Sequence, residues 1–152
     1  MSIIRNARLA RYATLGVLVL VLLAMGLSIL FLFDEGRSAE AKIQHFAATL
    51  PSLFFVGGIW MTERAFKAIA VGQAVELALS NLLERLGICL FLGGMAFVFG
   101  RPLILKALLD SSAWGWFDVP AITLGCVGLL LFVLGRPLRV AAAARAELDE
   151  IL

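Results

Sequence analysis

The sequence predicts an all-α integral membrane protein. The expected architecture is an antiparallel four-transmembrane-helix bundle, with a long cytoplasmic hairpin between the second and third helices and a C-terminal cytoplasmic helix. Of its 152 residues, 62% are hydrophobic, and the mean hydropathy is +1.00. Stretches free of Asp, Glu, Lys, Arg and His run over 12–33, 46–62, 86–100 and 119–135. A helix needs about 20 mostly apolar residues to cross a bilayer, so we expect one transmembrane domain over 1–152.

The basic residues predict the orientation in the membrane. Most of them lie before the first stretch, between the second and third stretches, or after the fourth. These residues are Arg5, Arg8, Arg11, Arg64, Lys67, Arg85, Arg136, Arg139 and Arg145. The other two connections carry Arg37, Lys42, Arg101 and Lys106. Because cytoplasmic loops are enriched in Lys and Arg, we expect a multi-pass protein of the bacterial inner membrane with both termini in the cytoplasm. The net charge of +2 predicts no direct binding of nucleic acid.

The first helix is expected over about 12–33 and the second over about 46–71. The first apolar run is too long for the core of a cleaved signal peptide, so it is interpreted as a retained transmembrane helix. Pro51 is placed in the first two turns of the second helix, where a missing amide donor costs least. Gly72 is the expected C-cap of this helix. The helix is expected to continue beyond the apolar stretch through Glu63, Arg64 and Lys67.

The third helix is expected over about 74–100, ending at Arg101-Pro102. With the second helix it would form the cytoplasmic hairpin, whose tip lies around Gly72. The outer connection that follows carries Trp114 and Trp116, which are interpreted as anchors at the membrane interface.

The fourth helix is expected over about 119–135, with Asp118 as its cap and Pro120 tolerated in its first turn. Pro137 permits a bend. A separate cytoplasmic helix is expected over about 138–151, with an apolar stripe of Ala141, Ala144, Leu148 and Ile151.

No pattern in the sequence indicates a catalytic, cofactor-binding or metal-binding residue. The single histidine, His45, cannot supply the paired axial ligands of a b-type cytochrome or the three or four ligands of a zinc site. Cys89 and Cys126 are at depths about 9 Å apart in their helices, too far apart for a disulfide, and are interpreted as buried, inert thiols. The membrane stretches contain no buried carboxylate of the kind that ion-coupled carriers use. We therefore expect a protein that is not an enzyme.

Small residues four positions apart give each helix a possible packing face. The pairs are Ala24 and Ser28, Gly58 and Thr62, Ala96 and Gly100, and Ala121 and Gly125. Such spacing lets helix backbones approach closely in lipid. Packing within one chain is the favoured interpretation, and a homo-oligomer is the alternative.

The middle of the chain resembles a known family. Residues 66–73 (FKAIAVGQ) and 82–87 (LLERLG), with the acidic end 144–151 (ARAELDEI), resemble the domain of unknown function 2975 family, the YoaS-like small bacterial membrane proteins. The sequence departs from the family pattern at Ala74 and Val75, where small polar residues are common. The resemblance implies a four-helix inner-membrane protein, often encoded beside a helix-turn-helix regulator, and it supplies no catalytic residues.

The leading functional hypothesis is a non-enzymatic membrane interaction protein, surrounded by the lipid bilayer. It would be an anchor or sensor for a cytoplasmic regulator, or an accessory subunit of a larger membrane complex. The candidate partner-binding residues are Arg139, Arg145, Glu147 and Asp149. The alternative is a transporter or binding protein for an apolar small molecule such as a lipid or quinone. Its slot would be lined by Thr49, Ser52, Thr123 and the glycines at 57, 58, 93, 94, 125 and 128.

Overall fold

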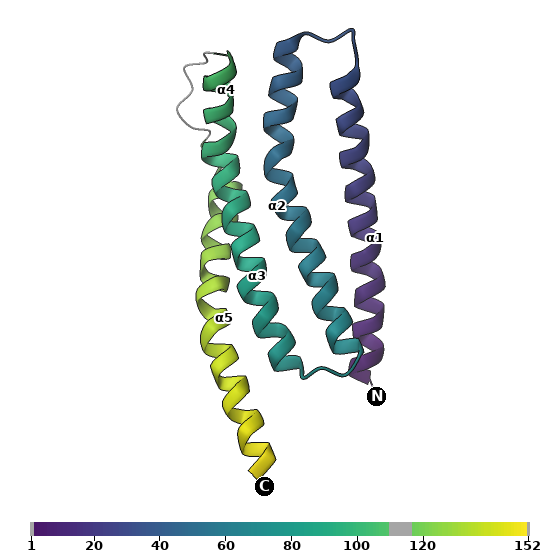
Figure 1. Ribbon diagram of the computed structural model, residues 1–152, viewed down its shortest axis with the longest axis vertical. Coiled ribbons are helices and arrows are strands. Elements are labelled where there is room, and N and C mark those ends of the chain that lie inside the picture. Colours follow the sequence, from purple (N-terminus) through teal and green to yellow (C-terminus); the bar gives the residue numbers. More distant parts are fainter. Residues whose placement is uncertain (1, 110–116, 152) are drawn as a thin grey trace.

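The computed structural model describes residues 2–109 and 117–151 and is helical throughout most of them. The elements are α1 (Ser2–Leu30), the short 3-10 helix η1 (Phe31–Phe33), α2 (Ala39–Ala70), α3 (Val75–Met95), the π-helical η2 (Ala96–Gly100), α4 (Arg101–Leu109) and α5 (Val119–Ile151). Helices α3, η2 and α4 follow one another without a break, so the chain forms four long helical rods that alternate in direction (Figure 1). The expectation of an all-α protein is confirmed.

The rods form an open row instead of a closed bundle. In the described residues, α1 contacts α2 but neither α3 nor α5, and α5 contacts α3 and η2 but neither α1 nor α2. The order across the row is therefore α1, α2, α3 and α5 (Figure 1). Short connections explain why sequential rods are neighbours, but they do not require the row to close.

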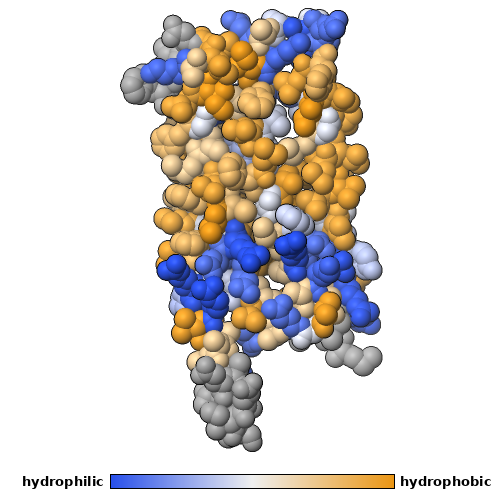
Figure 2. Space-filling model, in the orientation of Figure 1, coloured by the Kyte–Doolittle hydropathy of each residue, from blue (hydrophilic) through white to orange (hydrophobic). Residues whose placement is uncertain are grey.

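Three of the rods are long and apolar enough to cross a membrane. They are Arg5–Phe33, Val75–Leu109 and Val119–Arg145, with 29, 35 and 27 residues. Helix α2 is not among them, although it has 32 residues, because Thr49, Pro51 and Ser52 dilute its apolar stretch. Figure 2 shows a broad hydrophobic belt with hydrophilic residues above and below it. Membrane insertion satisfies such a surface, since the exposed apolar side chains contact lipid instead of water.

Helices α3 and α5 meet backbone to backbone along a seam of glycines. A methyl carbon added to Gly128 would lie 2.5 Å from the Phe91 backbone nitrogen and 2.7 Å from the Gly87 carbonyl oxygen. One added to Gly94 would lie 2.7 Å from the Ala121 carbonyl oxygen. Apolar side chains gain little by leaving lipid for another helix, so this close approach and its dispersion contacts hold the two helices together.

The third rod continues beyond its expected end. The expectation that Arg101-Pro102 ends it is wrong, because the helix continues through α4 to Leu109. A proline inside an α-helix removes one hydrogen bond and clashes with the carbonyl four residues earlier. Here the wider turn of η2 comes directly before the buried Pro102, and such a π-bulge lets the helix pass the proline without ending.

Three other helix boundaries also differ from expectation. Helix α1 starts at Ser2 and α2 at Ala39, so Pro51 lies well inside α2 and not in its first two turns. Helix α5 runs without interruption past Pro137 to Ile151, so there is no separate tail helix. Its start at Val119, with Pro120 in the first turn, is as expected, and the Asp118 carbonyl accepts from the Ile122 amide at 3.1 Å.

The turn between α2 and α3 depends on one glycine. Gly72 has φ +99°, a left-handed conformation that residues with a side chain rarely adopt. The Gly72 amide donates to the Ile69 carbonyl and the Gln73 amide to the Ala68 carbonyl, both at 3.0 Å. This pair of bonds is the Schellman motif, which satisfies the last carbonyls of a helix. The prediction of Gly72 as the helix C-cap residue is confirmed.

Candidate functional site

The larger share of the arginines and lysines lies at the end of the row that carries the α2–α3 turn. We call it the basic end, because Arg11, Arg64, Lys67, Arg85 and Arg139 lie there. Figure 2 shows a hydrophilic band below the hydrophobic belt. The C-terminal part of α5 extends beyond this band, past the start of α3 (Figure 1).

Two glutamates at the basic end join the outer helices to the inner ones. Arg11 Nε in α1 donates to Glu63 Oε1 in α2 at 2.8 Å, and Glu63 is only 8% exposed. Arg139 Nη1 in α5 donates to Glu84 Oε2 in α3 at 3.0 Å. Each pair links helices that are neighbours in the row. Both outermost helices, α1 and α5, are therefore fixed to an inner helix by a charge-assisted hydrogen bond.

The four expected partner-binding residues do not form one free surface. Arg139 is bound to Glu84, and Arg145 Nη1 lies 3.8 Å from Glu76 Oε1. These two arginines therefore hold α5 against the first turns of α3. Glu147 and Asp149 belong to the last turns of α5, but their side chains lie outside the described residues, as do those of Leu148 and Ile151. Trp114 and Trp116 are in 110–116, which the structure does not describe.

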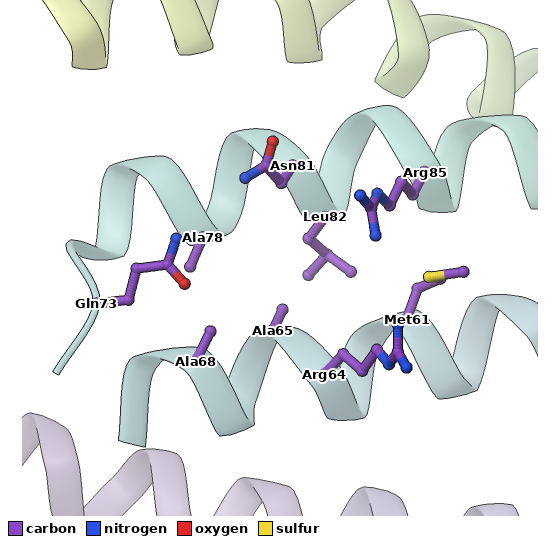
Figure 3. Close-up of a pocket in the computed structure, with 9 residues that line it drawn as sticks. All are labelled: Met61, Arg64, Ala65, Ala68, Gln73, Ala78, Asn81, Leu82 and Arg85. Atoms are coloured by element: carbon purple, nitrogen blue, oxygen red, sulfur yellow. The ribbon is translucent and has the colours of Figure 1, made fainter. Parts of the chain in front are cut away.

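A pocket lies between α2 and α3 at the basic end, with a volume of about 150 Å3. Arg64 from α2 and Arg85 from α3 both extend into the space between the two helices, with Met61 beside them (Figure 3). The amide side chains of Gln73 and Asn81 lie toward the Gly72 turn, and Leu82 and three alanines form the apolar wall. We call this the Arg64–Arg85 pocket.

An aromatic ring next to the pocket holds one of its two arginines. Arg64 Cζ lies 4.5 Å from the centroid of the Trp60 ring, a cation–π contact, and Trp60 is 46% exposed. Tryptophans with one apolar face and one wet face mark the headgroup level of a membrane. Among the described residues, no Asp or Glu lines the pocket.

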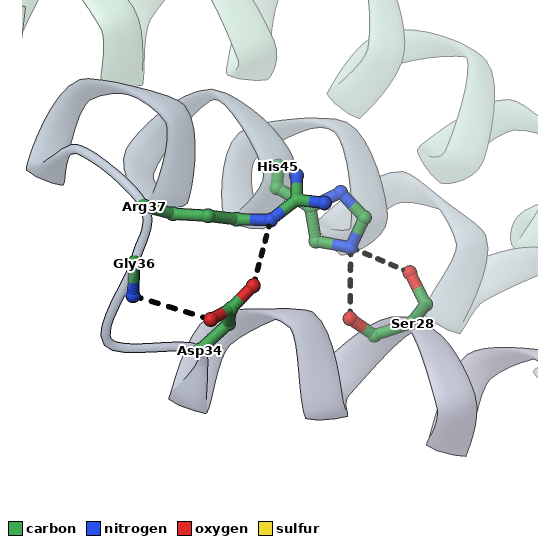
Figure 4. A network of polar contacts seen from close by, with 5 residues as sticks. All are labelled: Ser28, Asp34, Gly36, Arg37 and His45. Carbon is green, nitrogen blue, oxygen red and sulfur yellow. Dashed lines mark hydrogen bonds and ion pairs between the residues drawn. The ribbon is translucent and has the colours of Figure 1, made fainter.

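The opposite end of the row carries a compact polar network around His45. His45 Nε2 lies 2.6 Å from Ser28 Oγ and 2.9 Å from the Ser28 carbonyl oxygen (Figure 4). Because a carbonyl only accepts, the geometry fits the tautomer that carries the proton on Nε2. Asp34 accepts from Arg37 Nε at 3.3 Å and from the Gly36 amide at 3.2 Å, and Arg37 stacks on Phe31. This network orders the α1–α2 connection and ties α1 to α2, which agrees with a structural, hydrogen-bonding role for His45.

The residues of the expected apolar slot do not converge. Thr49 and Thr123 donate to carbonyls of their own helices, Gly57 and Gly58 face Cys89, and Gly93 faces Phe55. Gly94 and Gly125 do line one shallow groove on the α3–α5 surface, with a volume of about 290 Å3. Its other walls are apolar and include Phe91, Met95 and Leu129.

The two thiols and the acidic residues form no reactive cluster in the described part of the chain. Cys89 and Cys126 are both free; Cys89 is half-buried and Cys126 is exposed on α5, so the interpretation of the two thiols as buried is wrong. In the same residues, no three His, Cys, Asp or Glu side chains come together as a metal site would require.

Comparison with known proteins gives no relative: no family model, curated protein or solved structure matches the chain.

Sequence reasoning missed the Arg64–Arg85 pocket. Arg64 and Arg85 were counted for topology and not as a site. The repeated dipeptide Glu-Arg at 63–64 and 84–85, placed on either side of the Gly72 turn, is the signal that could have found it. Neighbouring positions on a helix point about 100° apart, so each glutamate can face an outer helix while each arginine faces the pocket.

Proposed function

We propose that the chain crosses the bacterial inner membrane four times, with both termini and the α2–α3 turn in the cytoplasm. Helix α2 lies between α1 and α3 and contacts both. At 1.5 Å per residue its 32 residues are about 48 Å long, which exceeds the roughly 30 Å of the hydrocarbon core. The basic end carries the larger share of Arg and Lys, which favours the cytoplasm for that end.

We further propose a non-enzymatic interaction protein, in which the end of α5 is the contact for a partner. The observation that carries this proposal is the continuity of α5, which extends as one helix beyond the start of α3 (Figure 1). The Arg139–Glu84 and Arg145–Glu76 pairs fix its direction at the base. A projecting helix that is braced in this way presents its last turns without a large loss of conformational entropy on binding.

The partner class that we propose is a helix-turn-helix regulator or a larger membrane complex. This rests on the resemblance of residues 66–73, 82–87 and 144–151 to the domain of unknown function 2975 family. The sequence of the last turns of α5 supports it through its mixed charge, since Arg145, Glu147 and Asp149 would give a polar contact that can select a partner by complementary charge.

A photocrosslinking experiment in native membranes tests this proposal. A photoreactive amino acid at Val140, which is 70% exposed, should yield one stoichiometric cross-linked protein. The double reversal Glu147→Arg and Asp149→Arg should abolish the adduct, because it inverts the charge of the contact. As a matched control, Asp34→Arg with Arg37→Asp changes charges at the opposite end and should leave the adduct unchanged. No adduct at Val140, or the same adduct after the reversal, would refute the α5 contact.

The alternative, a binding protein for an apolar small molecule, is favoured by the groove at Gly94 and Gly125. Binding sites for small molecules are concave and mostly apolar, and this groove of about 290 Å3 fits that description. Mass spectrometry of protein purified from the native membrane would support it by finding a stoichiometric lipid or quinone that Gly125→Leu removes. A ligand that survives this substitution, or none at all, would count against it.

A further inference from the structure

We propose that the Arg64–Arg85 pocket binds a phosphate group, carried either by an anionic phospholipid or by a soluble phosphate ester. This site is independent of any partner at the end of α5. Basic pockets between membrane helices are suited to anionic headgroups, and three features of this pocket support that assignment.

The first feature is uncompensated charge. Glu63 and Glu84 directly precede the two arginines, but Glu63 is bound to Arg11 and Glu84 to Arg139. Each glutamate thus faces an outer helix, while Arg64 and Arg85 are left on the shared face of α2 and α3. Within the described residues no carboxylate lines the pocket. An anion that enters therefore meets two positive charges without competition from a side-chain carboxylate.

The second feature is donor geometry. A guanidinium presents several N–H donors in one plane and matches the oxygens of a phosphate in a bidentate manner. Stacking on Trp60 occupies the face of the Arg64 guanidinium at 4.5 Å and leaves its edge free to donate. The amide side chain of Gln73, which also lines the pocket, adds a neutral donor on the side of the Gly72 turn (Figure 3).

The third feature is size and depth. A water molecule takes about 30 Å3 in the liquid, so a pocket of about 150 Å3 has room for a group of phosphate size. Trp60 is outside the pocket lining, but it is half-exposed and stacks on Arg64, and a tryptophan of this kind is typical of headgroup depth. A phospholipid whose phosphate is bound at this level would place its acyl chains along the apolar belt of Figure 2.

The test is ligand-induced thermal stabilisation of the full chain in a neutral detergent. Four probes are compared at equal ionic strength: short-chain phosphatidylglycerol, short-chain phosphatidylcholine, glycerol 3-phosphate and inorganic phosphate. The pocket variant is Arg64→Gln with Arg85→Gln. The matched control is Arg8→Gln with Arg136→Gln, which removes the same charge from exposed arginines outside the pocket.

We expect phosphatidylglycerol, glycerol 3-phosphate or both to raise the Tm of the wild type and the control variant, and phosphatidylcholine to have a much smaller effect. The pocket variant should need at least about tenfold more ligand for the same shift, since each arginine near the surface contributes severalfold to anion affinity. Stabilisation by phosphatidylglycerol alone identifies a lipid as the source, and stabilisation by the soluble esters identifies a free phosphate. If the pocket variant fails to fold, a salt titration of the wild type replaces it. Raising NaCl from 0.05 to 0.5 M should weaken binding of the phosphate probe to the wild type severalfold.

Three results would overturn the proposal. The first is an equal shift for the pocket and control variants. The second is an equal shift with phosphatidylcholine and phosphatidylglycerol. The third is a wild type that no phosphate probe stabilises at any salt concentration.

Discussion

At the scale of single residues, glycines decide where α3 and α5 touch. The sequence contains 14 glycines, and they are not equivalent in the structure. Gly87 and Gly128 face each other's backbone, whereas nothing lies within 4 Å of a methyl group added to Gly16 or Gly26. Gly16 and Gly26 lie in α1, which has a single neighbouring rod.

Gly128→Ala should destabilise the protein, and Gly26→Ala should not. The new methyl of Gly128→Ala would lie 2.5 Å from a backbone nitrogen, so α3 and α5 must separate, and overpacking of this kind costs about 1–3 kcal/mol. Gly26→Ala meets open space, and its effect should stay within about 0.5 kcal/mol. Thermal unfolding in detergent measures both. Equal stability of the two variants would show that the glycine seam does not hold α3 to α5.

Sequence spacing predicted part of this seam. The pair Ala121 and Gly125 was expected to form a packing face, and both residues do contact Gly94. Gly87, Gly128 and Gly135 were not predicted to form a packing face, because none of them belongs to the pairs of small residues four positions apart; Gly128 was named only for the apolar slot. The pair Ala24 and Ser28 lies on α1, where Ala24 is exposed and Ser28 binds His45. A spacing rule identifies faces that can approach closely, but which faces do so depends on the neighbouring helix.

At the scale of elements, α1 is held to α2 by a polar contact near each end. Arg11–Glu63 lies at the basic end and Ser28–His45 at the other. The apolar face between them gives little net attraction, since lipid solvates it equally well.

Removing both contacts should loosen α1 more than either change alone. We expect His45→Leu and Glu63→Gln each to lower the free energy of unfolding by about 0.5–2 kcal/mol. The contacts are on opposite ends of a long helix pair, so the double variant should show the sum of the two effects. Thermal unfolding of the single and double variants measures this. Thr14→Ala is the control, because the Thr14 hydroxyl donates to the Ala10 carbonyl of its own helix. A loss in Thr14→Ala as large as in the double variant would contradict the prediction.

The positions of helix ends were the least predictable property of the elements. Arg101-Pro102 was interpreted as the end of a helix and Pro137 as a bend before a separate helix, but the chain stays helical through both. At Pro102 a π-helical turn accommodates the ring. In contrast, the glycine stop at residue 72 was predicted correctly, because a left-handed residue is a stronger local requirement than a proline that the helix can pass.

At the scale of the whole molecule, composition predicted a membrane protein because long uncharged apolar runs are typical of helices that cross a bilayer. Composition could not predict the open row, which follows from the contacts between rods. The repeated Glu-Arg dipeptide at 63–64 and 84–85 was a signal for the Arg64–Arg85 pocket, but whether the two arginines face each other depends on how α2 and α3 are rotated about their axes. The ion pairs Arg11–Glu63 and Arg139–Glu84 set that rotation. In each pair the two residues are distant in the sequence.

We propose that α2 crosses the membrane with the other rods, which would bring the basic end and both termini to the cytoplasmic side. A dual reporter fused after Leu152, with alkaline phosphatase for the periplasm and a fluorescent protein for the cytoplasm, tests it directly. Four spans predict fluorescence and no phosphatase activity there, and phosphatase activity when the reporter is inserted at Gly36. Phosphatase activity after Leu152 would contradict the account, because it would mean an odd number of spans.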